Sequence, residues 1–182
     1  MIESDCCQRC CCPNTREFTV NILDKSNPQE VIRIHREFKC CSCCGCWCGS
    51  CPHCMQEVTV ESPPGTIIGT VTQVGTSFGM NYLIKDAYDT STLYIIGPSC
   101  LCHGPATYCC ENKFTLLGSD HETEIGAIHK KYSVFFRECC SNPDIFSMKV
   151  PMNLDVKMKA LVLGALFLID FMVFAIHPQP CK

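Results

Sequence analysis

Cysteines are the densest group of chemically reactive side chains, with 20 among 182 residues. Eight of them lie within residues 40–54, and a smaller group upstream comprises Cys6, Cys7, Cys10, Cys11 and Cys12. In the larger group, Cys43/Cys46 and Cys51/Cys54 have the C-x2-C spacing that tetrahedral zinc sites use. The loop of about 12 to 20 residues that usually separates two ligand pairs is missing, so zinc is only one alternative.

Clustered cytosolic cysteines can instead carry acyl chains that hold a protein at a membrane. Each buried CH₂ group contributes about 0.8 kcal/mol, so one chain holds weakly and several hold firmly. The first residues have neither a basic segment nor an apolar one, so nothing marks the chain for secretion and we expect reduced thiols. A third interpretation is a reduced structural loop, and spacing alone does not choose among the three.

A second polar group, from Asn142 to Asp155, directly precedes an apolar segment at residues 160–176. As a helix, these 17 residues would extend about 25 Å. The hydrocarbon core of a bilayer is ~30 Å thick, and Asp170 at bilayer depth would cost about 2.5 kcal/mol or more. The segment is apolar on every face, which suits either a membrane span or a helix enclosed by protein.

The elements that position these groups are predicted to be mostly strands. Segments that alternate apolar and polar residues, bounded by Gly, Pro, Asn or Asp, occur at 16–24, 29–38, 55–61, 66–74, 81–86, 92–97, 113–117, 124–130, 133–137 and 145–150. A fully apolar helix after about ten strands must be buried, and a β-barrel wrapped around it would bury it. We therefore expect a single domain over residues 1–182 that includes the hydrophobic helix at 160–176.

Charge and catalytic motifs narrow the function further. The net charge of −3 creates no strong field, so nucleic acid is not an expected partner. No Ser/His/Asp or Cys/His arrangement with discernible pairing appears, so we predict that the chain is not an enzyme.

Five motifs, together with the multi-cysteine segment, resemble those of the phospholipid scramblases. They are MQEV at 55–58, SPPGTIIG at 62–69, IGP at 96–98, LDVKMKA at 154–160 and FLIDFM at 167–172. The resemblance implies a mainly β, tubby-like fold, in which an antiparallel β-barrel encloses a hydrophobic C-terminal α-helix. Compared with the family, the chain lacks a proline-rich N-terminus and the first strands, so we expect an incomplete barrel with an exposed edge.

The resemblance also implies a function and a location. The family moves membrane phospholipids between leaflets without ATP and in response to calcium, at the cytosolic face of the plasma membrane. The acyl acceptors would be Cys40, Cys41, Cys43, Cys44, Cys46 and Cys48. The membrane or core helix would contribute Ala160, Gly164, Phe167, Asp170, Phe171 and Phe174, either enclosed by the barrel or crossing the membrane once. The alternative is a membrane-attached adaptor that binds proteins without moving lipid.

The calcium-binding positions of the family correspond here to Asn142, Asp144, Phe146, Met148, Val150 and Asn153. Two carboxylates of the family have become Asn142 and Asn153. Calcium takes about six to eight oxygen ligands and its affinity follows their charge, so we expect weak or lost binding. Zinc at the cysteines stays a minority alternative.

A weaker motif is similar to the nuclear import signal of some relatives. It comprises Ile128, His129, Lys130 and Lys131, with Ala127 in place of a family lysine and Tyr132 in place of a tryptophan. Short basic runs are common at the solvated ends of strands, so we favour that interpretation over nuclear entry.

Overall fold

The computed structural model describes residues 2–3, 5, 7–8, 12, 14–39, 55–75, 80–98, 112–131 and 145–174. These ranges form strands and a C-terminal helix: β1 (Ile2–Glu3), β2 (Phe18–Leu23), β3 (Glu30–Arg36), β4 (Glu57–Glu61), β5 (Ile67–Val74), β6 (Asn81–Asp86), β7 (Ser91–Ile96), β8 (Lys113–Leu117), β9 (Glu124–Lys131), β10 (Ile145–Lys149) and α2 (Val156–Ile169), which continues as the π-helix η2 (Asp170–Phe174).

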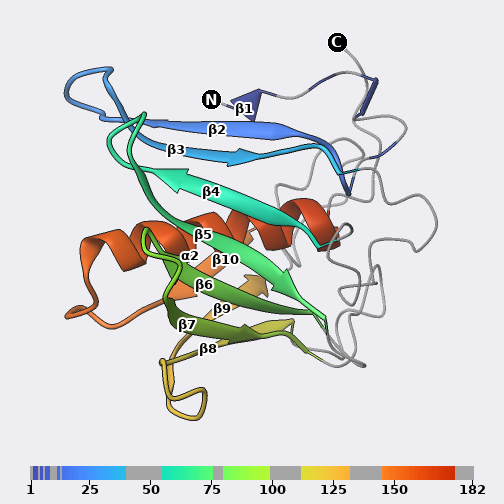
Figure 1. The fold of residues 1–182 in the computed structure, drawn as a ribbon, viewed down its shortest axis with the longest axis vertical. Coiled ribbons are helices and arrows are strands. Elements are labelled where there is room, and N and C mark those ends of the chain that lie inside the picture. The colour runs from blue at the N-terminus through green and yellow to red at the C-terminus, as the bar shows by residue number, and fades with distance from the viewer. Residues whose placement is uncertain are drawn as a thin grey trace.

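The strands form one antiparallel sheet in which each strand pairs with its neighbours in the chain. The spatial order is therefore β1 to β10, with β1 and β10 at the two ends of an open sheet. Figure 1 shows this sheet curving around α2, with β2 and β3 above the helix, β4 and β5 passing in front of it, β7 and β8 below it, and β9 and β10 behind it. The mainly β fold with an enclosed C-terminal helix is confirmed.

Alternation along the strands decides which face each side chain occupies. In β4, Val58 and Val60 are fully buried, whereas Glu57, Thr59 and Glu61 lie on the outer face and are only partly buried. Because successive side chains of a strand point to opposite sides, the valines face the helix and the polar residues face solvent.

The turn after β4 contains Gly65 with a φ of 92°, a conformation that a glycine adopts without strain. Its backbone N–H donates a hydrogen bond of 2.8 Å to the Glu61 carboxylate. The sequence SPPG at 62–65 therefore forms a tight connection between β4 and β5, which pair as antiparallel neighbours.

The helix begins at Val156, four residues before the predicted segment. Asp155 is its N-cap, and its carboxylate accepts a hydrogen bond of 2.8 Å from the Val156 N–H. The prediction of 160–176 started at the first uninterrupted apolar residue and excluded Lys157 and Lys159. The first helical turn protrudes from the sheet, since Val156 is 75% exposed, and it can therefore include charged residues such as these lysines.

The core lies between the helix and the inner face of the sheet. It contains buried side chains from almost every strand and from one long stretch of helix: Phe18, Val20, Ile34, Val58, Val60, Val71, Tyr82, Ile84, Ile95, Phe114, Leu116, Ile128, Leu161, Val162, Ala165, Leu168 and Ile169. Because protein surrounds α2 on several sides, the helix is apolar around its circumference.

Nine of the ten predicted strands correspond to observed strands, most with ends shifted by one or two residues. The tenth, at 133–137, lies outside the described residues. The sequence did not predict β1, which has only two residues and is recognised by its pairing of Ile2 with Val20 and of Glu3 with Thr19. A segment this short carries no alternation that a sequence could reveal.

Candidate functional site

The last turn of the helix contacts strands near both ends of the open sheet. Phe171 stacks on Phe18 of β2, with ring centroids 4.2 Å apart and planes inclined by 21°. Phe174 packs against Phe146 of β10, with centroids 5.8 Å apart and a tilt of 60°. The open sheet is therefore bridged by η2, which contacts one aromatic ring from near each end.

Three buried cations surround this aromatic group. The Arg16 guanidinium lies 4.5 Å from the Phe171 ring, and the Lys130 ammonium lies 3.7 Å from the Phe174 ring. Arg36, which is fully buried, lies 5.7 Å from the Phe18 ring and donates a hydrogen bond to the Asn14 carbonyl. Cations over aromatic faces and near a helix C-terminus are both electrostatically favourable.

The six helix residues singled out in the sequence all lie in α2 or η2. Ala160, Gly164, Phe171 and Phe174 are buried, and Phe167 and Asp170 are half-buried. Among the described residues, no helix is both long and apolar enough to cross a bilayer. The core contacts of the buried α2 and η2 side chains place this segment against the inner face of the sheet.

Gly164 allows α2 to approach the sheet closely. A Cβ atom at this position would lie 2.7 Å from Cγ2 of Val60, which is closer than side-chain carbon atoms pack. On β5, a Cβ on Gly69 would meet the Lys85 carbonyl oxygen at 2.2 Å and the Leu161 side chain at 2.9 Å. At each of these glycines, the backbone of one element therefore lies directly against a side chain of the other, Val60 in one case and Leu161 in the other.

Four of the six calcium positions lie in the described residues. Phe146 and Met148 belong to β10 and pack against the core, Val150 follows that strand, and Asn153 is exposed in the turn before the helix. Alternate residues of a strand are about 7 Å apart, whereas oxygens that bind calcium at about 2.5 Å lie within ~5 Å of one another. These described members do not fit one shared calcium ion. Asn142 and Asp144 lie outside the described residues.

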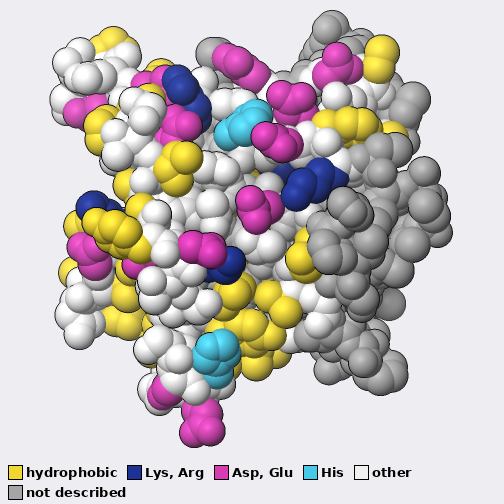
Figure 2. Space-filling view, in the orientation of Figure 1, with side chains coloured by type: hydrophobic (Ala, Val, Ile, Leu, Met, Phe, Trp, Pro, Cys, Tyr) yellow, Lys and Arg dark blue, Asp and Glu magenta, His cyan; other side chains and the backbone are white. Residues whose placement is uncertain are grey.

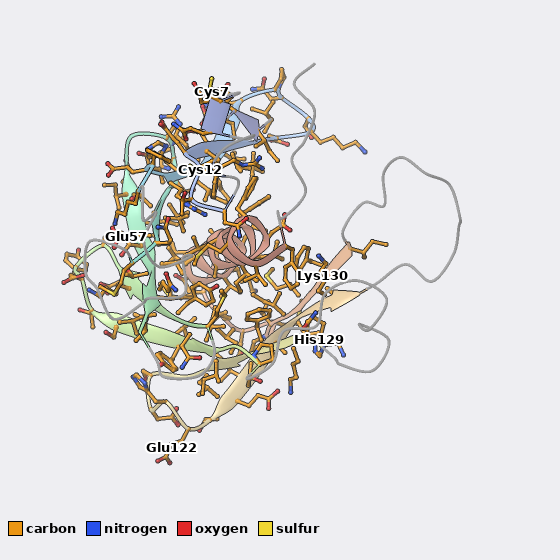
Figure 3. The ribbon with its side chains drawn as sticks, turned by 90° about the vertical axis from the view of Figure 1, so that its right-hand side faces the viewer. Cys7, Cys12, Glu57, Glu122, His129 and Lys130 are labelled. Atoms are coloured by element: carbon orange, nitrogen blue, oxygen red, sulfur yellow. The ribbon has the colours of Figure 1, made fainter. Side chains whose placement is uncertain are left out.

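The import-like motif is part of β9. Ile128 is 1% exposed, His129 is half-buried, and Lys130 is 7% exposed with its ammonium over the Phe174 ring. The side chains of His129 and Lys130 are labelled in Figure 3. The backbone of Lys131 pairs with Ile145 of β10. A receptor that reads an extended basic segment would have to detach β9 from the sheet first.

The six predicted acyl acceptors, Cys40, Cys41, Cys43, Cys44, Cys46 and Cys48, lie outside the described residues. In the described part of the chain, Cys7 is an exposed free thiol and Cys12 is a half-buried one, and no group of three or more residues is placed to hold a metal ion. We call residues 40–54 the cysteine segment. The structure describes the residues on either side of it, where the Lys39 ammonium donates a hydrogen bond of 3.1 Å to the Met55 carbonyl.

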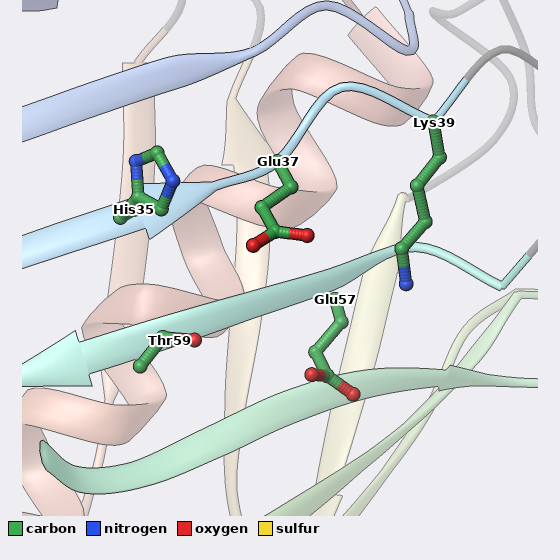
Figure 4. Close-up of a pocket in the computed structure, with 5 residues that line it drawn as sticks. All are labelled: His35, Glu37, Lys39, Glu57 and Thr59. Carbon is green, nitrogen blue, oxygen red and sulfur yellow. The ribbon is translucent and has the colours of Figure 1, made fainter.

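A depression of about 80 Å³ lies beside these ends, on the outer face of β3 and β4 (Figure 4). We call it the outer depression, and it is lined by His35, Glu37, Lys39, Glu57 and Thr59. Figure 2 shows a histidine surrounded by acidic side chains on the part of the surface where β2 to β4 run. This site was not predicted from the sequence. The available signal was the polar half of the alternation in β3 and β4.

Comparisons with known proteins agree with the motifs. A sequence model of the Scramblase family matches residues 1–176. Phospholipid scramblase 1 of Mus musculus is 38% identical over 172 residues, which cover 94% of this chain and 49% of the relative. Phospholipid scramblase 2 of Bos taurus is 37% identical, covering 94% and 55%. Phospholipid scramblase family member 5 of Homo sapiens is 38% identical over 174 residues, covering 94% and 59%.

The chain spans about half the length of the curated relatives it matches. No solved structure is significantly similar to it.

Proposed function

Because the chain belongs to the Scramblase family, we propose that it is a phospholipid scramblase, which moves phospholipids in both directions between membrane leaflets without ATP. The observation that carries the proposal is the extent of the similarity. Relatives named phospholipid scramblases align with 94% of this chain, including the enclosed helix. Such movement makes and breaks no covalent bond, so the protein acts without enzyme chemistry.

Attachment to the membrane, in this proposal, depends on acylation of the segment at 40–54. Acylation is favoured by the density of cysteines in this segment, which follows β3 and precedes β4 in the chain. Several acyl chains provide firm attachment without a spanning helix. The proposed location is the cytosolic face of the plasma membrane.

Acylation can be tested directly. Metabolic labelling with an alkyne fatty acid should mark the protein, and hydroxylamine should remove the label because it cleaves thioesters. Replacement of Cys40, Cys41, Cys43, Cys44, Cys46 and Cys48 by serine should abolish the label. A label that persists in this variant would assign the acyl chains to other cysteines, for example Cys7 or Cys12.

We further propose that the calcium response is weakened. The support is the replacement of two acidic positions by Asn142 and Asn153, and the strand conformation of Phe146 and Met148. The rate of lipid movement should therefore change little between chelator and millimolar calcium.

Lipid movement is tested by reconstitution. The purified full chain is placed in liposomes that carry a fluorescent phospholipid in both leaflets, and an impermeant reductant then bleaches the outer leaflet. A scramblase brings the inner pool to the reductant, so that fluorescence falls below the plateau of protein-free liposomes. Fluorescence that stays at this plateau, with and without calcium, would contradict the proposal. A dye-leakage measurement confirms that the liposomes stay sealed.

A second candidate is a membrane-attached adaptor that binds proteins. The observation that favours it is the burial of the apolar helix within the sheet, together with the open sheet edges at β1 and β10. Exposed strand edges can pair with a strand from another chain. A protein that is acylated and recovered with membranes, but leaves the lipid distribution unchanged, would be assigned to this class.

A further inference from the structure

The outer depression brings together side chains of both charge signs. Glu37 and Glu57 carry carboxylates and Lys39 carries an ammonium, and among the described residues none of these three takes part in an ion pair. Figure 4 shows the side chains arranged around a shared space between β3 and β4. The depression therefore offers separate positive and negative positions to a ligand.

The hydrogen bonds within the site hold some of its groups in place and leave others available. Glu57 accepts a hydrogen bond of 2.9 Å from the Thr72 hydroxyl through Oε2, so that Oε1 is available to accept one from a ligand. Nδ1 of His35 is 3.0 Å from the Thr19 hydroxyl. This contact orients the ring and leaves Nε2 available to a ligand. Lys39 uses one of its three N–H donors on the Met55 carbonyl.

The size of the depression limits the ligand to a small group. A water molecule needs ~10–15 Å³ of the same kind of space, so about 80 Å³ admits a few heavy atoms. A short chain that bears an ammonium at one end fits, with a larger anionic group at the rim. A ligand that carries both charges within a few atoms of each other matches this arrangement.

The position of the depression indicates where such a ligand comes from. Lys39 and Met55 are the last described residues before the cysteine segment and the first after it. If that segment is acylated, as the proposed function states, the depression is tethered close to the lipid headgroups. Headgroups at a membrane surface have a high local concentration, so a weak site there is occupied without a high intrinsic affinity.

We propose that the outer depression binds the headgroup of an aminophospholipid, namely a primary ammonium linked through a short chain to a phosphate. The carboxylates of Glu37 and Glu57 accept hydrogen bonds from the ammonium. Lys39, with the Thr59 hydroxyl and His35, donates to the phosphate oxygens. This inference rests on the proposed function, because that function places lipid headgroups beside the site.

The chemistry predicts a preference among headgroups. A primary ammonium has three N–H donors, whereas the quaternary ammonium of choline has none and is larger. An ethanolamine headgroup should therefore bind better than a choline headgroup. Charge-assisted hydrogen bonds to carboxylates supply the difference.

The test uses the full chain labelled with ¹⁵N and follows backbone amide shifts. Titration with O-phosphoethanolamine should shift the amides of residues around the depression, with a Kd on the order of 1 mM. Phosphocholine, ethanolamine and inorganic phosphate, titrated separately, should each bind more weakly. No shifts at β3 and β4, or equal binding of phosphocholine, would overturn the inference.

A matched pair of variants ties binding to the site. Glu57→Gln keeps an acceptor for the Thr72 hydroxyl but removes the charge, and it should weaken O-phosphoethanolamine binding roughly fivefold. Glu122→Gln removes an exposed carboxylate from the turn between β8 and β9, far from Glu57 in Figure 3, and should leave binding unchanged. Unchanged affinity in Glu57→Gln, with an intact amide spectrum, would contradict the assignment.

The same measurement with phospholipid nanodiscs distinguishes a lipid headgroup from a free metabolite. Phosphatidylethanolamine nanodiscs should shift the same amides, and phosphatidylcholine nanodiscs should shift them less. If free O-phosphoethanolamine binds and the nanodiscs produce no shift at the depression, the lipid assignment is wrong. Lipid movement is measured separately in liposomes, so failure of headgroup binding and failure of scrambling are distinguishable.

Discussion

Phe18 on the second strand and Phe171 in the last helical turn stack with their ring centroids 4.2 Å apart, although 152 positions separate them in the chain (171 − 18 − 1). Both side chains are almost completely buried. Since β2 lies near one end of the open sheet, this contact joins that end to the C-terminus of the helix. It therefore links an early element to the last one.

Phe18→Ala should lower the free energy of unfolding by about 3–5 kcal/mol, because it removes a large buried ring and leaves a cavity. Urea denaturation followed by circular dichroism measures this loss. Phe18→Leu, which retains more apolar volume, should lose less. A loss below about 1 kcal/mol in Phe18→Ala would show that the stack is dispensable.

Gly164→Ala should destabilise the protein although alanine is the better helix former. The propensity gain is about 1 kcal/mol, whereas overpacking against the stiff Val60 side chain, 2.7 Å from the new Cβ, costs typically about 1–3 kcal/mol. Denaturation of Gly164→Ala, Val60→Ala and the double variant forms the test. The two effects should be less than additive, because Val60→Ala makes room for the new methyl group. Strict additivity would mean that the two side chains do not compete for the same space.

Lys130 should react slowly with amine reagents, because it is 7% exposed and its ammonium lies over Phe174. Brief treatment with a water-soluble acetylating ester, followed by peptide mass spectrometry, compares it with the exposed Lys157. We expect Lys157 to be modified much faster. Equal rates would show that β9 opens readily and that the import-like motif is accessible in the folded protein.

Asp120 should titrate below the ordinary range of an aspartate. Its carboxylate accepts hydrogen bonds from the Thr123 hydroxyl and from the backbone N–H groups of Thr123 and Glu122, and these bonds lower the pKa of Asp120. The folded state thus favours the charged form. This contribution to stability is present above the pKa of Asp120 in the unfolded chain and is lost as the pH falls through the lower folded pKa.

Carboxyl carbon chemical shifts, followed during an acid titration, measure this pKa. Thr123→Val removes the hydroxyl donor and should raise the pKa of Asp120 toward its ordinary value. A pKa for Asp120 that is the same in both proteins would contradict the role of the hydroxyl.

Calcium binding to the purified chain should be absent or no tighter than millimolar in isothermal titration, because two acidic positions have become Asn142 and Asn153. Asn142→Asp combined with Asn153→Asp should raise the affinity if the loop keeps its geometry. Magnesium serves as the control for nonspecific charge effects. Micromolar binding by the unaltered chain would overturn the prediction of a weakened response.

The amino-acid sequence by itself determined the elements and the family. Alternation of apolar and polar residues sets the faces of strands such as β4, where Val58 and Val60 turn inward, because a pleated strand has a fixed period of two residues. The apolar run at 160–176 required a buried or lipid-facing helix. The motifs around Gly65 and Asp170 identified the scramblase resemblance.

The tertiary structure decided the choices that local pattern leaves open. A helix that is apolar on every face is compatible with both lipid and protein, so its burial follows only from the curvature of the sheet around it. Contacts between distant positions, such as Lys130 with Phe174 and Arg16 with Phe171, have no local signature. The outer depression has no local signature either. His35 and Glu57, which lie on opposite sides of the cysteine segment in the chain, become neighbours only because β3 pairs with β4.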